Sequence, residues 1–181
     1  MRLGPLALSH ADGRYLAWLH DPEVTRFLEA RLTDYDADRL RAYIAAEFER
    51  PNAVLFGMFM HQDGRLIGTI KLSEIRGTHR NCNIGLMIGE KSVWGQGYGT
   101  EAIALASGYA FDTLGMHKIL AGCYAGNTGS FRAFIKAGYR IEGRLADDRW
   151  DGTAFVDRIV LGKINPGEMP AASSQSQRET A

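Results

Sequence analysis

Alternate glycines mark the part of this sequence whose residue types most clearly suggest chemistry. The segment reads Gly95-Gln96-Gly97-Tyr98-Gly99-Thr100. Glycine lacks a Cβ, so the backbone can turn sharply there and approach a ligand closely. A helical pattern follows, and the first N–H groups of a helix are unpaired and favour a negative charge. The segment therefore predicts a binding site for a phosphate or diphosphate.

Two common phosphate-binding motifs do not fit this segment. A P-loop carries Lys and then Ser or Thr after its last glycine, whereas Thr100 and Glu101 stand here. The dinucleotide fingerprint has the spacing G-x-G-x-x-G early in a β-α-β unit, but the spacing here is G-x-G-x-G in the middle of the chain. Nucleotide hydrolysis and dinucleotide binding are disfavoured, and a purely structural turn stays an alternative.

The elements around the glycines follow from apolar periodicity and turn residues. We expect strands at residues 3–8, 53–61, 65–75, 81–88, 117–124, 139–149 and 154–161. We expect helices at 9–20, 36–50, 98–114 and 130–137, with a further short helix that begins at Asp21-Pro22. This order is typical of an α+β domain around one mixed sheet. The domain is expected over residues 1–164, and a disordered tail rich in Ser, Gln, Ala and Glu over 165–181.

Composition disfavours several classes of protein. The 181 residues contain 21 Lys and Arg and 21 Asp and Glu, so net charge gives no reason to expect nucleic acid or a membrane as partner. Cys82 and Cys123 lie in apolar runs without metal-ligand spacing, which indicates buried thiols and no metal site. No segment has the composition of a signal peptide or a membrane span, so we expect a cytoplasmic protein.

Two motifs connect the chain to a known family. The first is Trp94-Gly95-Gln96-Gly97-Tyr98-Gly99, and the second is Asn127-Thr128-Gly129-Ser130 followed by Lys136-Ala137-Gly138-Tyr139. In this order they resemble the GNAT superfamily of N-acetyltransferases, whose loop pattern is Gln or Arg, two residues, Gly, one residue, then Gly or Ala. Tryptophan replaces the first residue, as is common in the branch that acetylates N-termini of ribosomal proteins, with relatives acting on nucleotide-linked amino sugars and polyamines.

The resemblance implies a fold and a co-substrate. The fold would be a mixed, mostly antiparallel central sheet flanked by helices, with the fourth and fifth strands splayed apart at a bulge near Gly85 or Gly89. Acetyl-coenzyme A (acetyl-CoA) would be the co-substrate, with no metal. Its pyrophosphate and pantetheine arm would be bound by Leu86, Met87, Ile88, Gly95, Gln96, Gly97, Tyr98, Gly99, Thr100, Asn127 and Lys136.

The implied reaction is direct attack of a neutral amine on the thioester, which needs an oxyanion donor and an acid for the departing thiolate. A backbone N–H near Met87 or Ile88 is the implied oxyanion donor. Many members carry a tyrosine as the acid, but this position is Phe134, so Ser130 is the implied acid. Asn127 also fits the N-cap of the following helix, and Ser130 also fits local capping.

The sequence leaves the base open. The family's strand glutamate is replaced by Asn83, and Arg149 stands where the ribosomal-protein branch has a glutamate in its final hairpin. Asp148 and Glu74 are the candidate catalytic bases, with His79 or a water chain as alternatives. Each of these side chains fits a solvated surface position equally well.

The amine acceptor is open as well, and a small molecule and a peptide are both possible. Phe27, Glu29 and Arg31 are the candidate acceptor contacts, because early helices form one wall of the acceptor pocket in the family. Residues 15–31 resemble members from surface-polysaccharide and flagellar sugar synthesis, so we weigh an amino sugar nucleotide slightly above a protein N-terminus. Homodimers are frequent in the family. A non-catalytic acyl-CoA sensor is the alternative function, since both the strand glutamate and the motif tyrosine are missing.

Overall fold

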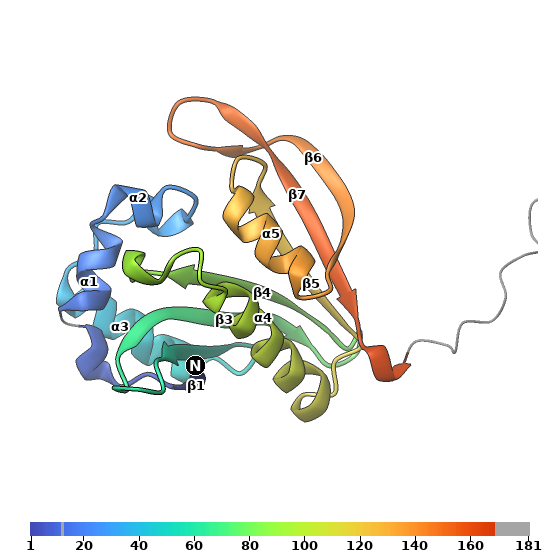
Figure 1. Cartoon of the computed structure of the whole chain (residues 1–181), viewed down its shortest axis with the longest axis horizontal. Coiled ribbons are helices and arrows are strands. Elements are labelled where there is room, and N and C mark those ends of the chain that lie inside the picture. Colours follow the sequence, from blue (N-terminus) through green and yellow to red (C-terminus); the bar gives the residue numbers. More distant parts are fainter. Residues whose placement is uncertain (12, 169–181) are drawn as a thin grey trace, which may run out of the picture.

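A mixed sheet with helices on both faces organises the chain (Figure 1). The computed structural model describes residues 1–11 and 13–168. Its seven strands lie in the order β1-β2-β3-β4-β5-β7-β6, and all neighbours are antiparallel except β4 and β5. The strands are β1 Arg2–Pro5, β2 Val54–Phe59, β3 Leu66–Arg76, β4 Asn81–Ile88, β5 Lys118–Tyr124, β6 Arg140–Trp150 and β7 Phe155–Ile164. The predicted α+β class and mixed, mostly antiparallel sheet are confirmed.

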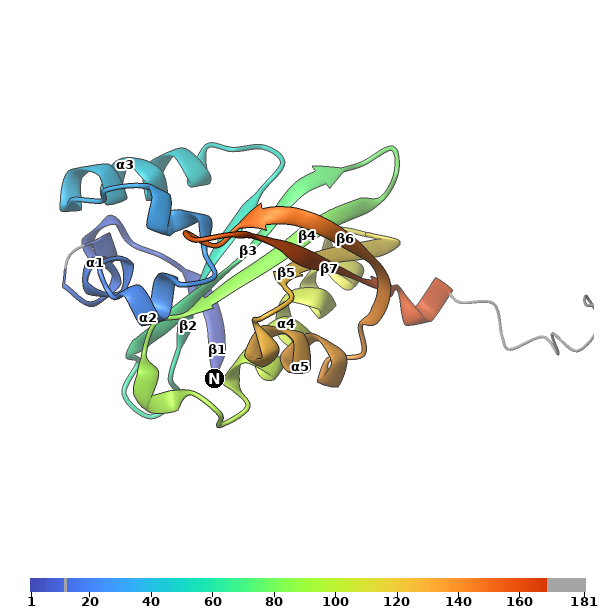
Figure 2. The ribbon, with the colours of Figure 1, turned by 90° about the horizontal axis from the view of Figure 1, so that it is seen from above.

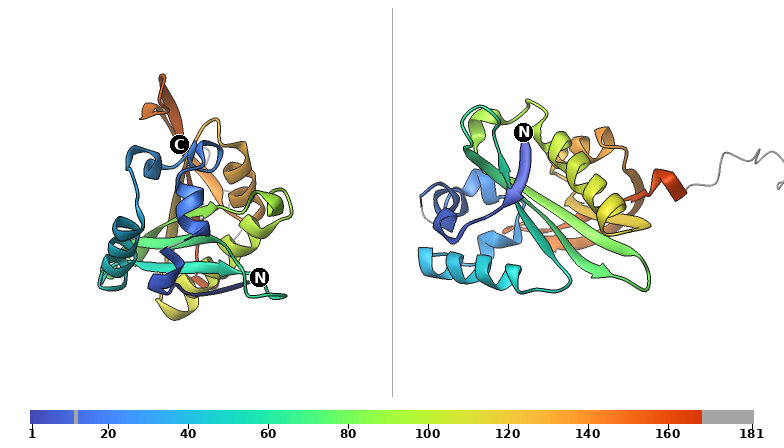
Figure 3. Two further views of the ribbon diagram at one scale, coloured as in Figure 1. Left: turned by 90° about the vertical axis from the view of Figure 1, so that its left-hand side faces the viewer. Right: turned by 90° about the horizontal axis from the view of Figure 1, so that it is seen from below.

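Helices α1, α2 and α3 lie on one face of the sheet, and α4 and α5 lie on the other (Figures 2 and 3). They are α1 Arg14–Leu19, α2 Pro22–Thr25, α3 Ala37–Phe48, α4 Tyr98–Gly108 and α5 Thr128–Lys136, with a short turn η2 at Glu29–Leu32. Each face has its own core of buried side chains, one containing Ile103 and Phe134 and the other containing Leu40 and Ile44. Because strand side chains alternate between faces, β4 contributes to both cores.

The sheet opens between β4 and β5. Their parallel pairing ends at Ile84 and Ala121, although β4 continues to Ile88 and β5 to Tyr124. Beyond this point the facing edges of the two strands have no ladder partner in the described sheet. The expected splay between the fourth and fifth strands is therefore present.

The bulge expected near Gly85 or Gly89 is absent from the β3–β4 pairing, which corrects that prediction. The register is continuous from Asn83 to Ile88, and its shift lies instead between Ser73 and Arg76. Gly89 has a different role, because a Cβ there would come within 1.9 Å of the Trp18 ring.

The N-termini of the helices differ in whether a side chain caps their first backbone amides. The side chains of Asp21, Asp36 and Asn127 cap α2, α3 and α5 by accepting from backbone amides. Helix α4 begins instead after Gly97, and no side chain caps it. The first amides of α4 therefore lack a protein cap.

Two segments differ from the sequence-based expectation. The predicted helix over 9–20 is divided by Gly13, at φ 65°, into a turn at Leu8–Ala11 and helix α1. At the other end, residues 165–168 continue from β7 and are attached to the body through Glu168, which contacts Arg80 and also His117 Nδ1 at 2.8 Å. The rest of the predicted tail, residues 169–181, lies outside the described residues.

Candidate functional site

The glycine segment forms a tight corner between β4 and α4. Gly95 and Gly97 have φ values of 76° and 91°, which residues with a side chain rarely adopt. A Cβ on either residue would meet no atom within 4 Å, so the space beside them is open and the backbone angle alone requires glycine. Tyr98, Gly99 and Thr100 follow in the uncapped first turn of α4. The corner has the geometry expected of a phosphate cradle.

Two side chains hold this corner against the end of β4. Trp94 Nε1 donates to the Ile88 carbonyl at 2.9 Å, and Gln96 Nε2 donates to the Ser92 carbonyl at 2.8 Å. These bonds fix the path of the backbone between strand and helix, so the amides of the corner are oriented before any ligand arrives.

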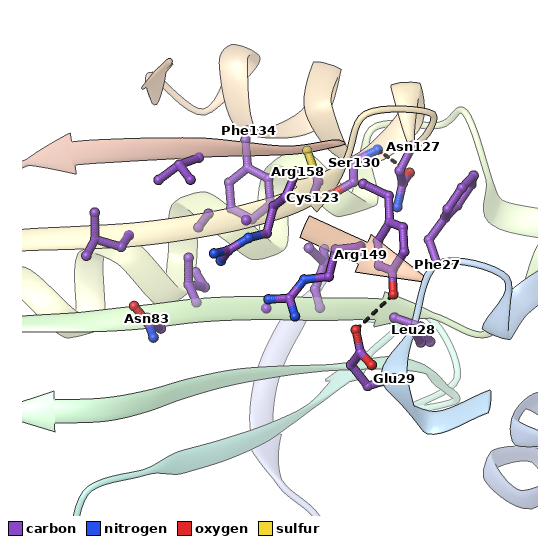
Figure 4. Close-up of a pocket in the computed structure, with 18 residues that line it drawn as sticks. Phe27, Leu28, Glu29, Asn83, Cys123, Asn127, Ser130, Phe134, Arg149 and Arg158 are labelled. Atoms are coloured by element: carbon purple, nitrogen blue, oxygen red, sulfur yellow. Dashed lines mark hydrogen bonds between the residues drawn. The ribbon is translucent and has the colours of Figure 1, made fainter. Parts of the chain in front are cut away.

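A cavity of about 410 Å³ lies where β4 and β5 diverge; we call it the front cavity (Figure 4). Its walls come from β4, β5, α5, the β6–β7 hairpin and the segment after α2. The predicted site residues that line it are Phe27, Glu29, Leu86, Asn127 and Ser130. Candidate cofactor and acceptor residues thus surround the same opening in the sheet.

One wall of the front cavity is the first half of α5. Asn127 Oδ1 accepts from the Ser130 amide at 3.1 Å, so the predicted N-cap is present. The Ser130 hydroxyl has no hydrogen-bond partner among the described residues and is able to donate into the cavity. Phe134 is 1% exposed and packs on Tyr139, with ring centroids 5.0 Å apart. Phe134 offers no hydroxyl to this wall.

A hydrogen-bond network absent from the sequence predictions joins η2 to the end of β5. The Tyr124 hydroxyl donates to Glu29 Oε1 at 2.8 Å and accepts from both terminal nitrogens of Arg31 at 3.1 Å. Burial raises the pKa of Tyr124, which keeps the hydroxyl protonated. The Phe27 ring lies beside it, with centroids 5.9 Å apart. The alternation of side chains along a strand could have predicted the position of Tyr124. It follows Cys123, which faces the core, and so points to the other side of the sheet.

The hairpin supplies positive charge to the front cavity. Arg149 and Arg158 both line it (Figure 4). The predicted base Asp148 is not among the lining residues. Its Oδ2 lies 2.7 Å from Arg158 Nε and 3.2 Å from Arg149 Nε. Asp148 therefore holds the two guanidinium groups in place.

Not every predicted site residue lines a cavity: Arg31 and Ile88 line neither, and the same holds for Glu74 and Lys136. Glu74 is exposed at the register shift of β3, where it forms an ion pair with Arg76. Lys136 is exposed in the last turn of α5. Neither residue lines either cavity described here.

A second cavity, of about 500 Å³, lies on the α3 side of β4; we call it the rear cavity. It shares Leu28, Glu29, Gly85 and Leu86 with the front cavity. Met87 lines the rear cavity, as do the hydroxyl-bearing residues Tyr15, Thr33, Tyr35, Tyr43, Thr69 and Ser73.

The cation of the rear cavity is held by a protein carboxylate, and two of the phenols are kept protonated by burial. Lys71 lines the cavity, and its Nζ contacts Oε1 of the buried Glu47 at 2.8 Å. Burial raises the pKa of Tyr15 to about 12 and also raises the pKa of Tyr43. Both phenols are therefore protonated at neutral pH and able to donate hydrogen bonds.

The described residues contain neither a helix that could span a membrane nor a metal cluster. No helix within residues 1–11 and 13–168 is long and apolar enough to span a membrane. Over the same residues, no group of three or more His, Cys, Asp or Glu side chains is arranged to hold a metal ion. Burial raises the pKa of the Cys82 thiol to about 11, and Cys123 is buried as well.

Comparisons with known proteins agree with this geometry. Residues 1–140 match a family model described as an acetyltransferase (GNAT) domain. A protein of Bacillus subtilis named "Probable N-acetyltransferase YjcK" is 36% identical over 139 residues, which is 76% of this chain and 71% of that protein. The ribosomal protein uS5 alanine N-acetyltransferase of Escherichia coli is 33% identical over 121 residues, which is 66% of this chain and 61% of that protein.

A solved structure supports the same fold. The spermidine N-acetyltransferase of Vibrio cholerae, in complex with CoA and spermine, matches with a TM-score of 0.79. The match covers 90% of this chain and 94% of that chain at 19% sequence identity. At this identity the likeness concerns the fold alone.

Proposed function

Because the chain belongs to the GNAT acetyltransferase family, we propose that it acetylates the primary amine of a small hydroxylated molecule, with an amino sugar nucleotide ahead of a protein N-terminus. Its family and relatives make it an acetyl-CoA-dependent N-acyltransferase. The observation that supports this acceptor class is the lining of the rear cavity, which includes six hydroxyl-bearing residues close to the opening of the sheet. Sugar hydroxyls find their hydrogen-bond partners in such a wall.

The described residues fit acetyl-CoA. The open corner at Gly95 and Gly97, backed by the uncapped start of α4, suits the pyrophosphate. The unpaired edge of β4 beyond Ile84 suits the amide groups of a pantetheine arm, which can extend the sheet as an added strand. Asn127, at the start of α5, borders the same cavity.

Bound acetyl-CoA supplies an acetyl thioester whose carbonyl carbon is attacked by the amine and whose thiol leaves. In our proposal a β4 amide near Met87 or Ile88 donates to the carbonyl oxygen as negative charge develops on it. The Ser130 hydroxyl, free of protein partners among the described residues, gives a proton to the departing sulfur.

A connection between η2 and the hairpin favours a small acceptor over a protein chain. Arg31 bridges η2 and the hairpin, because its guanidinium donates to the carbonyls of Leu28, at 2.7 Å, and of Trp150. The same guanidinium contacts Tyr124. A protein N-terminus would need a wide groove between η2 and the hairpin, and these bonds close that path.

The charges around the cavities also disfavour a polyamine. A polyamine carries several ammonium groups and calls for several carboxylates. Among the residues that line the two cavities, Glu29 is the only carboxylate, and Arg149, Arg158 and Lys71 are cations. The positive groups fit the phosphates of a sugar nucleotide better.

An acceptor screen tests this function. Thiol release from acetyl-CoA is measured with a uridine diphosphate-linked amino sugar, an alanine-initiated peptide amide and spermidine as acceptors. We expect the highest kcat/KM with the amino sugar nucleotide. A higher value with the peptide or with spermidine would overturn the acceptor assignment, while any accelerated release would retain the acetyltransferase.

A second candidate function is a non-catalytic acyl-CoA sensor. It is favoured by Phe134 and Asn83, which line the front cavity where a tyrosine and a glutamate would serve catalysis. A sensor binds acetyl-CoA, as calorimetry would show, but releases thiol no faster with any of the three amines. The same screen therefore separates the two functions.

A further inference from the structure

The front and rear cavities meet at one carboxylate. Glu29 lines both, together with Leu28, Gly85 and Leu86, and it is the only Asp or Glu among the lining residues of either cavity. An amine that enters from the rear cavity and reaches the opening of the sheet passes this side chain. Glu29 thus lies at the junction through which an acceptor must reach a thioester.

Tyr124 and Arg31 fix the orientation of Glu29. The Tyr124 hydroxyl donates to Oε1 of Glu29 at 2.8 Å, and Arg31 donates to the same hydroxyl at 3.1 Å. The arginine prevents the phenol from turning its lone pairs towards the carboxylate, so the phenol proton points at Oε1. The second oxygen, Oε2, has no hydrogen-bond partner among the described residues. Glu29 is therefore held through Oε1, and Oε2 is available to a ligand.

The other acidic groups near the site are used differently. Asp148 is shared between Arg149 and Arg158, and Glu47 is buried beneath Lys71 and Arg50. Neither is a lining residue of the cavities.

We infer that Glu29 accepts the proton of the acceptor ammonium, and this inference rests on the proposed function. An N–H bond of the ammonium breaks, an O–H bond forms at Glu29 Oε2, and the electron pair remains on nitrogen. That nitrogen then bonds to the thioester carbon as the C–S bond breaks. As the C–S bond breaks, sulfur takes the proton of the Ser130 hydroxyl, and the second proton that nitrogen loses restores this hydroxyl. Glu29 releases its proton to solvent.

Charged groups of both signs surround the junction. Arg149 and Arg158 come from the hairpin, Lys71 from β3 and Arg31 from η2, while Asp148 on the hairpin and Glu47 on α3 each pair with cations among them. The titratable phenols facing the junction are Tyr15, Tyr35, Tyr43 and Tyr124. Positive charge near an ammonium favours its neutral form but disfavours protonation of a carboxylate, so the step depends on the placement of Glu29 beside the amine and not on the surrounding field.

The variant Glu29→Gln tests the inference, because an amide oxygen still accepts from Tyr124 but takes no proton. The acceptors are the same three probe amines, with saturating acetyl-CoA. At about pH 7 we expect kcat to fall about 100-fold for the amine that the wild type uses best. Activity should recover as pH rises above about 9, since more of the amine is then neutral without a base. CoA affinity, measured by calorimetry, should be unchanged.

Glu49→Gln is the matched control, since Glu49 is an exposed residue just beyond α3 and lines neither cavity. It should match the wild type in kcat, KM and CoA affinity. A Glu29→Gln enzyme with raised KM but normal kcat would make Glu29 an ammonium-binding group and overturn the inference. Unchanged kinetics, or a loss that high pH does not restore, would overturn it too. A wild type that releases no thiol with any probe amine would remove the proposed function itself.

Discussion

Two backbone angles make the cofactor corner possible. Gly95 and Gly97 hold φ values at which a Cβ collides with the chain's own backbone, a cost of roughly 1–2 kcal/mol per residue. The open space beside them shows that neighbouring side chains do not impose this choice. If the glycines serve to direct amides towards a phosphate, as we propose, a substitution should affect binding before it affects the fold.

Replacing Gly97 with valine should abolish measurable CoA binding while the protein remains folded. A β-branched residue at φ 91° shifts the backbone and turns the first amides of α4 away. Calorimetry with CoA measures the loss, and circular dichroism checks the fold. Gly64→Val is the control, because Gly64 is also left-handed, at φ 68°, but lies in the β2–β3 turn. Equal CoA affinity for Gly97→Val and wild type would contradict the phosphate-cradle assignment.

Ser130→Ala should lower kcat about 10- to 100-fold with little change in CoA affinity, if the hydroxyl protonates the thiolate. The backbone amide of residue 130 still donates its hydrogen bond to Asn127 Oδ1 after this change, so the helix cap is retained. Thiol release under saturating substrates gives kcat, and calorimetry gives the affinity. An unaltered rate would remove Ser130 from the mechanism.

The separation of β4 and β5 and the start of α5 together determine where Ser130 lies. Strands β4 and β5 separate after Ile84 and Ala121, and α5 begins directly beyond β5 with its cap at Asn127. The helix is thereby positioned with Ser130 towards the gap. Since Asn127 both caps α5 and borders the cavity, its structural and binding roles have to be separated by substitution.

Asn127→Ala should lower the free energy of unfolding by about 1 kcal/mol, because the Ser130 amide loses its acceptor. Asn127→Ser keeps a capping oxygen and should retain most of that stability. If the asparagine amide also binds the pantetheine arm, both variants should weaken CoA binding, although only the alanine variant is destabilised. Urea unfolding and CoA calorimetry measure the two effects. Normal CoA affinity in Asn127→Ser would leave Asn127 with the capping role alone.

The whole molecule brings two faces of one sheet to a common opening. Helices α4 and α5 cover the face that carries the glycine corner, while α1, α2 and α3 cover the face that carries the rear cavity (Figures 1 and 2). The gap between β4 and β5 connects them near Gly85 and Leu86. A cofactor and an acceptor can therefore approach from opposite sides and meet without sharing an entrance.

The buried phenols of this packing predict loss of stability in alkali. The folded pKa of Tyr15 is about 12, above its value of 10.0 in the unfolded chain, because burial disfavours the phenolate. Its stabilising contribution is full below pH 10 and is lost as pH rises from about 10 to 12, on the order of 2 kcal/mol. Urea unfolding at about pH 8 and pH 11 measures this, and Tyr15→Phe should show a smaller decrease. An equal decrease in both proteins would contradict the assignment.

Local backbone chemistry explains what could be predicted from the sequence. The positive φ of Gly95 and Gly97, the cap at Asn127 and the alternation of the strands depend on residues close together in the chain. For this reason the element order, the mixed sheet and the glycine corner were accessible from residue types and spacing. The failures at this level were also local, such as the division of the first helix at Gly13.

Contacts between distant segments were decided only by the tertiary structure. Glu29 and Tyr124 are 95 positions apart, and Arg31 and Trp150 are 119 apart. Spacing alone carries no information on such pairs, because they form only once the packing of helices on a sheet has fixed their positions. The sequence therefore predicted a glycine corner with the geometry for a diphosphate in an acetyltransferase-like chain. Folding decided that Glu29, rather than Glu74 or Asp148, lies where the two cavities join.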